Sequence, residues 1–215
     1  MIISRRTFLG CAAGAVAVLR LPPVHGIAAR TALSTVRPST ILDLEEHCCL
    51  RESLVGYRDA LGALGPARRE VLIVPGVLGT PPWAARRIAQ ALDDGATVIL
   101  ESGAGFASAR EFRAHRAALD EYFQIRIEEP VPLWPARATP YVDFTWPSAV
   151  RIRDFTRAIP LASQPGEIIA RAGDCPVALA RRVGVGTLVF LGSPVGPALR
   201  AGDTQAHGWL ADVVG

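Results

Sequence analysis

Continuous apolar runs separated by periodic polar segments predict alternating strands and helices in the first half of the chain. The runs EVLIVPGVL at 70–78 and ATVIL at 96–100 are typical of strands buried on both faces of a sheet. Residues 80–95 predict a helix, with Thr80 as N-cap, prolines in the first turn and Gly95 as its stop. Helices are also predicted over residues 41–64, where the residues of one face recur at spacings of three and four, and over residues 107–123.

The second half of the chain has a different pattern. Residues 123–129 alternate like a strand, whereas residues 130–165 are rich in proline and are predicted to be irregular. Three short strands and a terminal helix are then predicted, over residues 167–173, 176–184, 186–194 and 201–214. Strands that alternate with helices early and an antiparallel set late predict an α/β fold of three layers, with helices on both faces of the sheet and an antiparallel C-terminal extension.

The N-terminus carries a targeting pattern. The stretch SRRTFL at 4–9 is followed by an apolar run from Phe8 to Leu19, which is shorter than the about 20 residues that span a bilayer. These residues resemble the twin-arginine export motif, with Gly10 where a lysine is common. An amphipathic or membrane-anchoring N-terminus is the alternative.

This resemblance divides the chain into three parts. We expect a twin-arginine signal peptide over residues 1–29, a linker over 30–40 and one α/β domain over 41–215. It implies a periplasmic or otherwise exported protein that meets the membrane only during export. Whether the leader is cleaved after Ala28 or Ala29, or is retained as an anchor, stays open.

The charge balance argues against a nucleic-acid partner. All 23 basic residues are arginines, and the chain has 20 acidic residues. Removing the three arginines of residues 1–29 leaves 20 against 20, so the rest of the chain is formally neutral. A phosphate-binding surface needs clustered basic residues. We therefore expect no nucleic acid among the partners.

Cysteines and histidines give no clear metal site. The spacing of Cys48, Cys49 and Cys175 fits no zinc motif, and His47 beside the vicinal pair is a weak ligand set. A disulfide from Cys175 to one of the pair and three free thiols both remain open. No metal or cofactor is predicted from the residues. The usual passengers of a twin-arginine leader leave a cofactor protein as a third hypothesis.

The order of elements resembles the class I glutamine amidotransferase-like superfamily. VLIVPG, then AARRIAQALDDGATVILESGAG, and later VGTLVFLGSP are similar to its strands, helix and elbow over about residues 70–110 and 176–195. The nearest resemblance is to non-catalytic versions such as the β-galactosidase trimerisation domain. The resemblance implies a flavodoxin-like, amidotransferase-like sheet, and by analogy it makes a homo-oligomer plausible.

The catalytic positions implied by this resemblance are vacant. Active members carry a Cys or Ser at the centre of a G-x-[CS]-x-G elbow. Setting Gly105 on the last glycine puts Gly103 on the nucleophile and Glu101 on the first glycine. Where the family has His-Pro-Glu, this chain has Ser193, Pro194 and Val195. The resemblance thus implies a catalytically vacant domain that acts as a ligand-binding or assembly module.

A serine hydrolase of the esterase or amidase type is the alternative. A shift of one residue would place Ser102 at the elbow, where it would need a histidine within about 3 Å. The candidates are His47, His115 and His207. We expect His115 to face the surface of its helix and His207 to be packed or exposed within the last helix.

Ligand-binding candidates gather at the turn after residues 96–100. Free N–H groups at a glycine-rich turn before a helix favour carboxylate or phosphate ligands, and α/β folds bind ligands at this edge. The expected residues are Glu101, as an exposed carboxylate, with Ser102, Gly103, Gly105 and Ser193. Candidates from other segments are Asp143, Trp146, Asp203 and the run Arg153-Asp154-Phe155. The partner, a small molecule or a protein, is not identified by the sequence.

Overall fold

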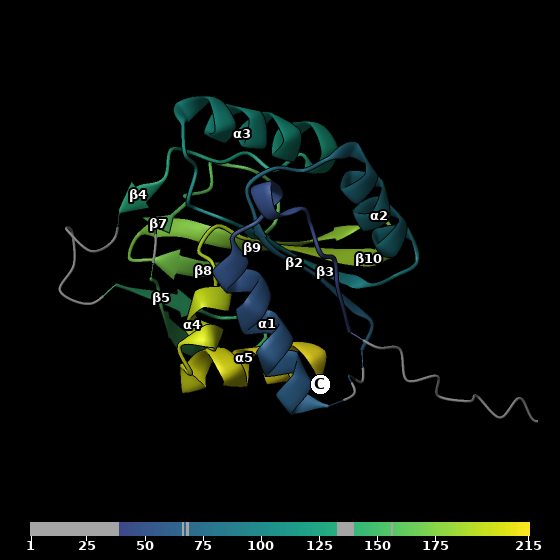
Figure 1. Ribbon diagram of the computed structural model, residues 1–215, viewed down its shortest axis with the longest axis vertical. Coiled ribbons are helices and arrows are strands. Elements are labelled where there is room, and N and C mark those ends of the chain that lie inside the picture. The colour runs from purple at the N-terminus through teal and green to yellow at the C-terminus, as the bar shows by residue number, and fades with distance from the viewer. Residues whose placement is uncertain (1–38, 66, 68, 133–139, 156) are drawn as a thin grey trace, which may run out of the picture. The chain divides into compact units, whose positions relative to one another are not determined.

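Figure 1 shows the chain as a computed structural model, which describes residues 39–65, 67, 69–132, 140–155 and 157–215. The predicted signal peptide over residues 1–29 and most of the linker lie outside this range. Export and cleavage therefore stay predictions. Within the described residues, no helix is long and apolar enough to cross a membrane.

One eight-stranded sheet organises the described chain. Its strands run in the order β1 (Thr40–Ile41), β2 (Val71–Val77), β3 (Thr97–Ser102), β10 (Gly186–Leu191), β9 (Cys175–Val183), β8 (Glu167–Ala172), β5 (Tyr141–Phe144) and β6 (Val150–Arg153). The first four are parallel and the remaining neighbours are antiparallel. A small separate sheet pairs β4 (Val131–Pro132) with β7 (Arg157–Ala158). The mixed α/β fold with a late antiparallel set is thus confirmed.

Helices cover both faces of the sheet (Figure 1). They are α1 (Arg51–Leu64), α2 (Pro82–Asp93), α3 (Ala109–Phe123), α4 (Gly196–Arg200) and α5 (Thr204–Val214). One apolar core holds Ile88 of α2 and Leu119 of α3, and the other holds Tyr57 of α1 and Trp209 of α5. Every residue of β2 is buried, as its unbroken apolar run predicted. The specific flavodoxin-like layering stays a prediction.

Three local expectations were wrong. The segment 41–64 has a short 3₁₀ helix at Glu46–Cys48 and is α-helical only from Arg51. The backbone before Arg51 is tied to β2, because Cys49 bridges Val77 and the N–H of Leu50 donates to Gly76 O at 2.7 Å. Residues 123–129 form no strand and make one isolated bridge, Ile127 to Leu161. The segment expected to be irregular contains the hairpin β5–β6, whose four-residue strands are too short to show a clear pattern.

Candidate functional site

The carboxyl ends of β3 and β10 lie side by side. Leu191 is paired with Glu101 in their parallel register, and this is the last pair between the two strands. Gly103 and Ser193, which the family resemblance assigned to catalysis, each follow this pair by two residues. This edge is also where α/β folds bind ligands.

Glu101 is fully buried, and the expectation of an exposed carboxylate was wrong. Its Oε2 accepts three hydrogen bonds, from Tyr57 Oη at 2.8 Å, Val195 N at 2.9 Å and Gly196 N at 3.1 Å. Burial raises the pKa of Glu101 above 4.5, although the donors around it lower it. The Ser53 hydroxyl also lowers this pKa, although it makes no hydrogen bond with the described residues. Glu101 thus links β3, α1 and the start of α4.

This link sits beside a close helix contact. A Cβ on Gly56 of α1 would lie 2.0 Å from Gly196 O, and one on Gly196 would lie 2.3 Å from Ser53 Cα. Only glycines allow the backbones of α1 and α4 to approach in this way. Glu101 and the two glycines therefore fix the packing of α1 and α4 above the end of β3.

Gly103 is held against the neighbouring strand. Its N–H donates to Val77 O at 2.8 Å, and a Cβ on Gly103 would lie 2.6 Å from Leu78 Cδ2 and 2.7 Å from Gly76 O. The backbone oxygen cannot swing aside as a side chain can. The position that the resemblance assigned to a nucleophile therefore has no room for a side chain in this chain.

Ser102 does meet a histidine. Ser102 Oγ lies 2.8 Å from His115 Nε2, and both residues are buried, so the expectation of a surface-facing His115 was wrong. Burial lowers the pKa of His115 to about 4. The ring of Phe106 lies against His115, with centroids 5.1 Å apart. The serine and the histidine are thus paired, with an aromatic ring packed against the histidine.

The pair lacks the other parts of a hydrolytic site. No group among the described residues meets His115 Nδ1, so nothing orients the ring as an acid does in a triad. Ser102 has no exposed surface. Gly103 and Gly105 do not have the left-handed backbone of a strained elbow. The serine oxygen is therefore closed to solvent in this structure. Of the other histidines, His47 is exposed and His207 Nε2 contacts Leu199 O at 3.0 Å.

The start of α3 already holds a carboxylate. Ser108 is its N-cap and accepts from Glu111 N at 3.3 Å, while Glu111 Oε2 accepts from Ala107 N at 2.9 Å. The sequence SARE makes this reciprocal capping possible. The chain's own carboxylate thus accepts one N–H group just before the helix, at the end of the turn predicted to bind an anionic ligand. Residues 103–108 form a loop instead of a tight turn.

The remaining candidates are dispersed. Ser193 Oγ donates to the buried carboxylate of Asp154, and Asp203 caps α5. Asp143 lies on β5, three strands from β10, and pairs with Arg151 at 2.8 Å. Trp146 follows β5, and its backbone oxygen accepts from Trp209 Nε1 at 2.9 Å. Asp143 and Trp146 therefore belong to the antiparallel side of the sheet and not to the edge at Gly103.

Two pockets share Leu50 near the carboxyl edge. One, of about 550 Å³, is lined by Leu50, Glu52, Phe155, Pro197, Arg200 and Ala201. The other, of about 350 Å³, is lined by Leu50, Ala104, Gly105, Phe106 and Arg157. Of these residues, the sequence singled out Gly105 and Phe155. Leu50 gave no signal, because it is one apolar residue in a segment predicted to be helical.

The cysteines and acidic residues form no metal centre in the described part of the chain. Cys48, Cys49 and Cys175 are free, the first two buried and the third exposed. No group of three or more His, Cys, Asp and Glu side chains among the described residues is placed to hold an ion. The open question of a disulfide is thus answered by three free thiols.

Comparisons with known proteins give a fold and no family. No model of a protein family matches the chain, and neither does any curated protein. Among solved structures, it is similar to an exo-β-1,4-mannosidase from Opitutaceae bacterium strain TAV5, with a TM-score of 0.52 and 14% identity over 75% of this chain and 30% of that one. It is also similar to a β-galactosidase from Bacillus circulans sp. alkalophilus, with a TM-score of 0.51 and 16% identity over 75% and 27%.

A β-galactosidase from Rahnella sp. R3 is similar to the same degree, with a TM-score of 0.52 and 15% identity over 75% of this chain and 26% of that one. At such identities the likeness shows the fold alone. The chain spans less than a third of the length of each of these three proteins. A domain of this fold is therefore a part of larger chains that include two β-galactosidases.

Proposed function

We propose that this chain is an exported, non-catalytic domain of amidotransferase-like fold that serves as an assembly module. The main support is the contact at Gly103, where a Cβ would lie 2.7 Å from the backbone oxygen of Gly76. A nucleophile at this position requires a different backbone. Glu101, two residues before it, and Ser193, at the family position of the base, are hydrogen-bonded inside the fold. In active members of the superfamily this edge carries the catalytic residues. Here the same positions are occupied by residues that pack and hydrogen-bond inside the fold.

The similar structures support the assembly role. In the mannosidase and the β-galactosidases, the matching part is less than a third of a chain whose name describes cleavage of a sugar. Most of each of those chains lies outside the match. We infer that the matching part is an accessory domain, in line with the trimerisation-domain resemblance. The same use here means self-association of this chain.

The contact surface that we assign to this role is the pocket lined by Leu50, Phe155 and Pro197 at the carboxyl edge. It is mainly apolar, and the Phe155 side chain is 39% exposed although it is a large hydrophobic residue. The guanidinium of Arg153 lies over its ring at 5.1 Å. Exposed apolar area of this kind is typical of protein contacts.

Sedimentation equilibrium of the full chain tests the assembly role. We expect a mass above the 22.9 kDa of one chain, and a shift toward one chain in Phe155→Glu. Val185→Glu is the matched control, because Val185 is 61% exposed in the turn between β9 and β10, away from this pocket. A wild-type chain that stays monomeric at tens of micromolar, or equal effects of the two variants, would refute the assignment.

Export is tested separately by the location of the protein in its host. We expect the full chain to reach the periplasmic fraction and the variant with Arg5→Lys and Arg6→Lys to stay in the cytoplasm. A variant that is exported as well as the wild type would show that the arginine pair is not read as a signal.

A further inference from the structure

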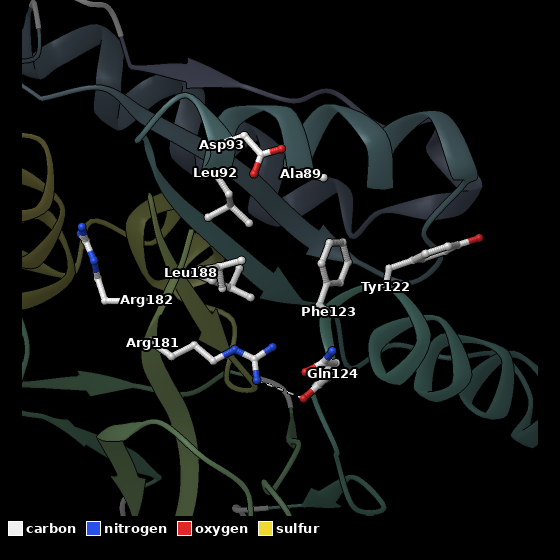
Figure 2. A pocket seen from close by; sticks show the side chains of 10 residues that line it. Ala89, Leu92, Asp93, Tyr122, Phe123, Gln124, Arg181, Arg182 and Leu188 are labelled. Carbon is white, nitrogen blue, oxygen red and sulfur yellow. Dashed lines mark hydrogen bonds between the residues drawn. The ribbon is translucent and has the colours of Figure 1, made fainter. Parts of the chain in front are cut away.

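A third pocket lies away from Phe155, at the amino end of the parallel strands β3 and β10. It is formed by the last turns of α2 and α3 and by the hairpin β9–β10, and it has a volume of about 340 Å³ (Figure 2). Its lining residues are Ala89, Leu92, Asp93, Tyr122, Phe123, Gln124, Arg181, Arg182, Val183 and Leu188. A pocket of this size suits a small organic molecule.

The floor of this pocket is apolar. Leu92, Phe123 and Leu188 are buried side chains from α2, α3 and β10. The Tyr122 side chain is 40% exposed at the rim. In Figure 2 these three floor residues lie between Asp93 and Arg181. A ligand with a compact apolar body would cover this floor.

Arg181 brings a cation to the pocket without an acid to neutralise it. Its Nη1 donates to Gln124 O at 3.2 Å, at the carboxyl end of α3 (Figure 2). Within the described part of the chain, its Nε is buried with no hydrogen-bond partner, and no carboxylate lies within ion-pairing distance. The guanidinium has five N–H bonds and keeps its charge.

The surroundings of Arg181 make its unpaired positive charge unfavourable. Desolvation by burial lowers the pKa of Arg181, because part of its hydration is lost without a carboxylate in return. The partial negative charge at the end of α3 is met by one of its N–H bonds. Arg182 adds a second positive charge to the lining, against one negative charge from Asp93. An anionic group is what the pocket lacks.

We propose that this pocket binds a small organic carboxylate whose apolar body lies on Leu92, Phe123 and Leu188 and whose carboxylate pairs with Arg181. The site is separate from the surface around Phe155, so it stands independently of the assembly role. Asp93 at the far side disfavours a second negative charge on the ligand. The site therefore selects monocarboxylates over dicarboxylates and over phosphate esters of the same size.

Titration of the full chain by isothermal calorimetry tests this site, with phenylacetate as the probe. Phenylethanol has the same apolar body without the charge, and phenethylamine carries the opposite charge. We expect saturable binding of phenylacetate, and about tenfold or more weaker binding of the other two, because a charge-assisted hydrogen bond is lost.

The variant Arg181→Met keeps an apolar stem and removes the charge, and we expect it to weaken phenylacetate binding about tenfold or more. Arg171→Met is the matched control, because Arg171 Nη1 also donates to a backbone oxygen, Asp174 O at 2.9 Å, and it lies on β8 outside the pocket. The control should bind as the wild type does. Equal binding of phenylacetate and phenylethanol, equal effects of the two variants, or no saturation by about 10 mM phenylacetate would overturn the proposal.

Discussion

Ser102 and His115, thirteen residues apart in the chain, form a hydrogen bond of 2.8 Å inside the core. The same two residue types at the same distance serve as nucleophile and base in hydrolases. Here the Ser102 hydroxyl has a second acceptor, Gly103 O at 3.1 Å. If its one proton goes there, His115 is the donor of the pair and not the base. The contact is a polar link between β3 and α3.

The buried imidazole predicts that the protein loses stability in mild acid. The pKa of His115 is lowered to about 4 by burial, from 6.5. As the pH falls from 6.5 to about 4, the unfolded chain binds a proton that the native chain does not. The free energy of unfolding should therefore fall over this window by up to about 3 kcal/mol. Urea denaturation at pH 7 and pH 4.5 measures it.

The control for this prediction separates His115 from the other titrating groups. His115→Gln should flatten the pH dependence, whereas His47→Gln should leave it unchanged because His47 is exposed. Glu101 acts in the opposite sense. Its pKa is raised by burial, so its contribution to stability is greatest below 4.5 and is lost as the pH rises through its native pKa. Glu101 is present in all three proteins. A full pH dependence in His115→Gln would contradict the assignment.

Ser102→Ala should lower the stability of the protein and should not change its esterase activity. The substitution removes the hydroxyl and leaves His115 Nε2 buried without a partner, which costs about 1–3 kcal/mol. We expect turnover of p-nitrophenyl acetate by the purified full chain to equal that of Ser102→Ala. Faster turnover by the wild type, with a burst of product, would mean that Phe106 opens and that the chain is a serine hydrolase.

The sequence predicted the elements that have long apolar runs or clear caps. The strands β2 and β10 lie within the predicted segments, and β3 runs two residues past its predicted end at residue 100. The helix α2 falls between Thr80 and Gly95 as expected, although Pro81 and not Thr80 is its N-cap. Runs of this kind are recognisable because every position points into one of two cores. The hairpin β5–β6 was missed because each of its strands has only four residues and lies in a segment rich in proline.

The sequence predicted where the candidate site lies, but not which contacts its residues make. A carboxylate at the end of a buried strand usually faces solvent, so Glu101 was expected to be exposed. Its partners Tyr57 and Val195 are 44 and 94 residues away, and no local pattern reports them. Gly103 is a glycine because the neighbouring strand approaches it, where the register of β2 against β3 shifts between Val74 and Val77. This contact depends on how β2 and β3 are paired, so no local sequence pattern predicts it.

Gly103→Ala and Gly105→Ala should separate the two glycines of the loop. A Cβ on Gly103 would lie 2.7 Å from Gly76 O, so the substitution should cost about 1–3 kcal/mol through overpacking. A Cβ on Gly105 would meet only Leu50 Cδ1 at 3.9 Å, an ordinary contact, so Gly105→Ala should be neutral or stabilising by up to about 1 kcal/mol. Urea denaturation measures both. Equal values would mean that β2 can retreat from Gly103.

Glu101→Ala should be among the most destabilising single substitutions in the domain. It leaves the Tyr57 hydroxyl and the N–H groups of Val195 and Gly196 buried without an acceptor, at a cost of about 3 kcal/mol or more. Tyr57→Phe removes only one of the three donors and should cost about 1 kcal/mol. Glu52→Ala, which loses an exposed ion pair of 3.8 Å with Arg200, is the control and should cost less than about 1 kcal/mol.

The double variant of Glu101→Ala and Tyr57→Phe decides whether the two residues act together. Removing both partners leaves one unsatisfied donor fewer than Glu101→Ala alone, so the combined loss should be smaller than the two single losses together by about 0.5–3 kcal/mol. Urea denaturation of the four proteins at pH 7 closes the cycle. Strict additivity would show that the Tyr57 hydroxyl finds another acceptor. In that case Glu101 would hold only α4, through the N–H groups of Val195 and Gly196.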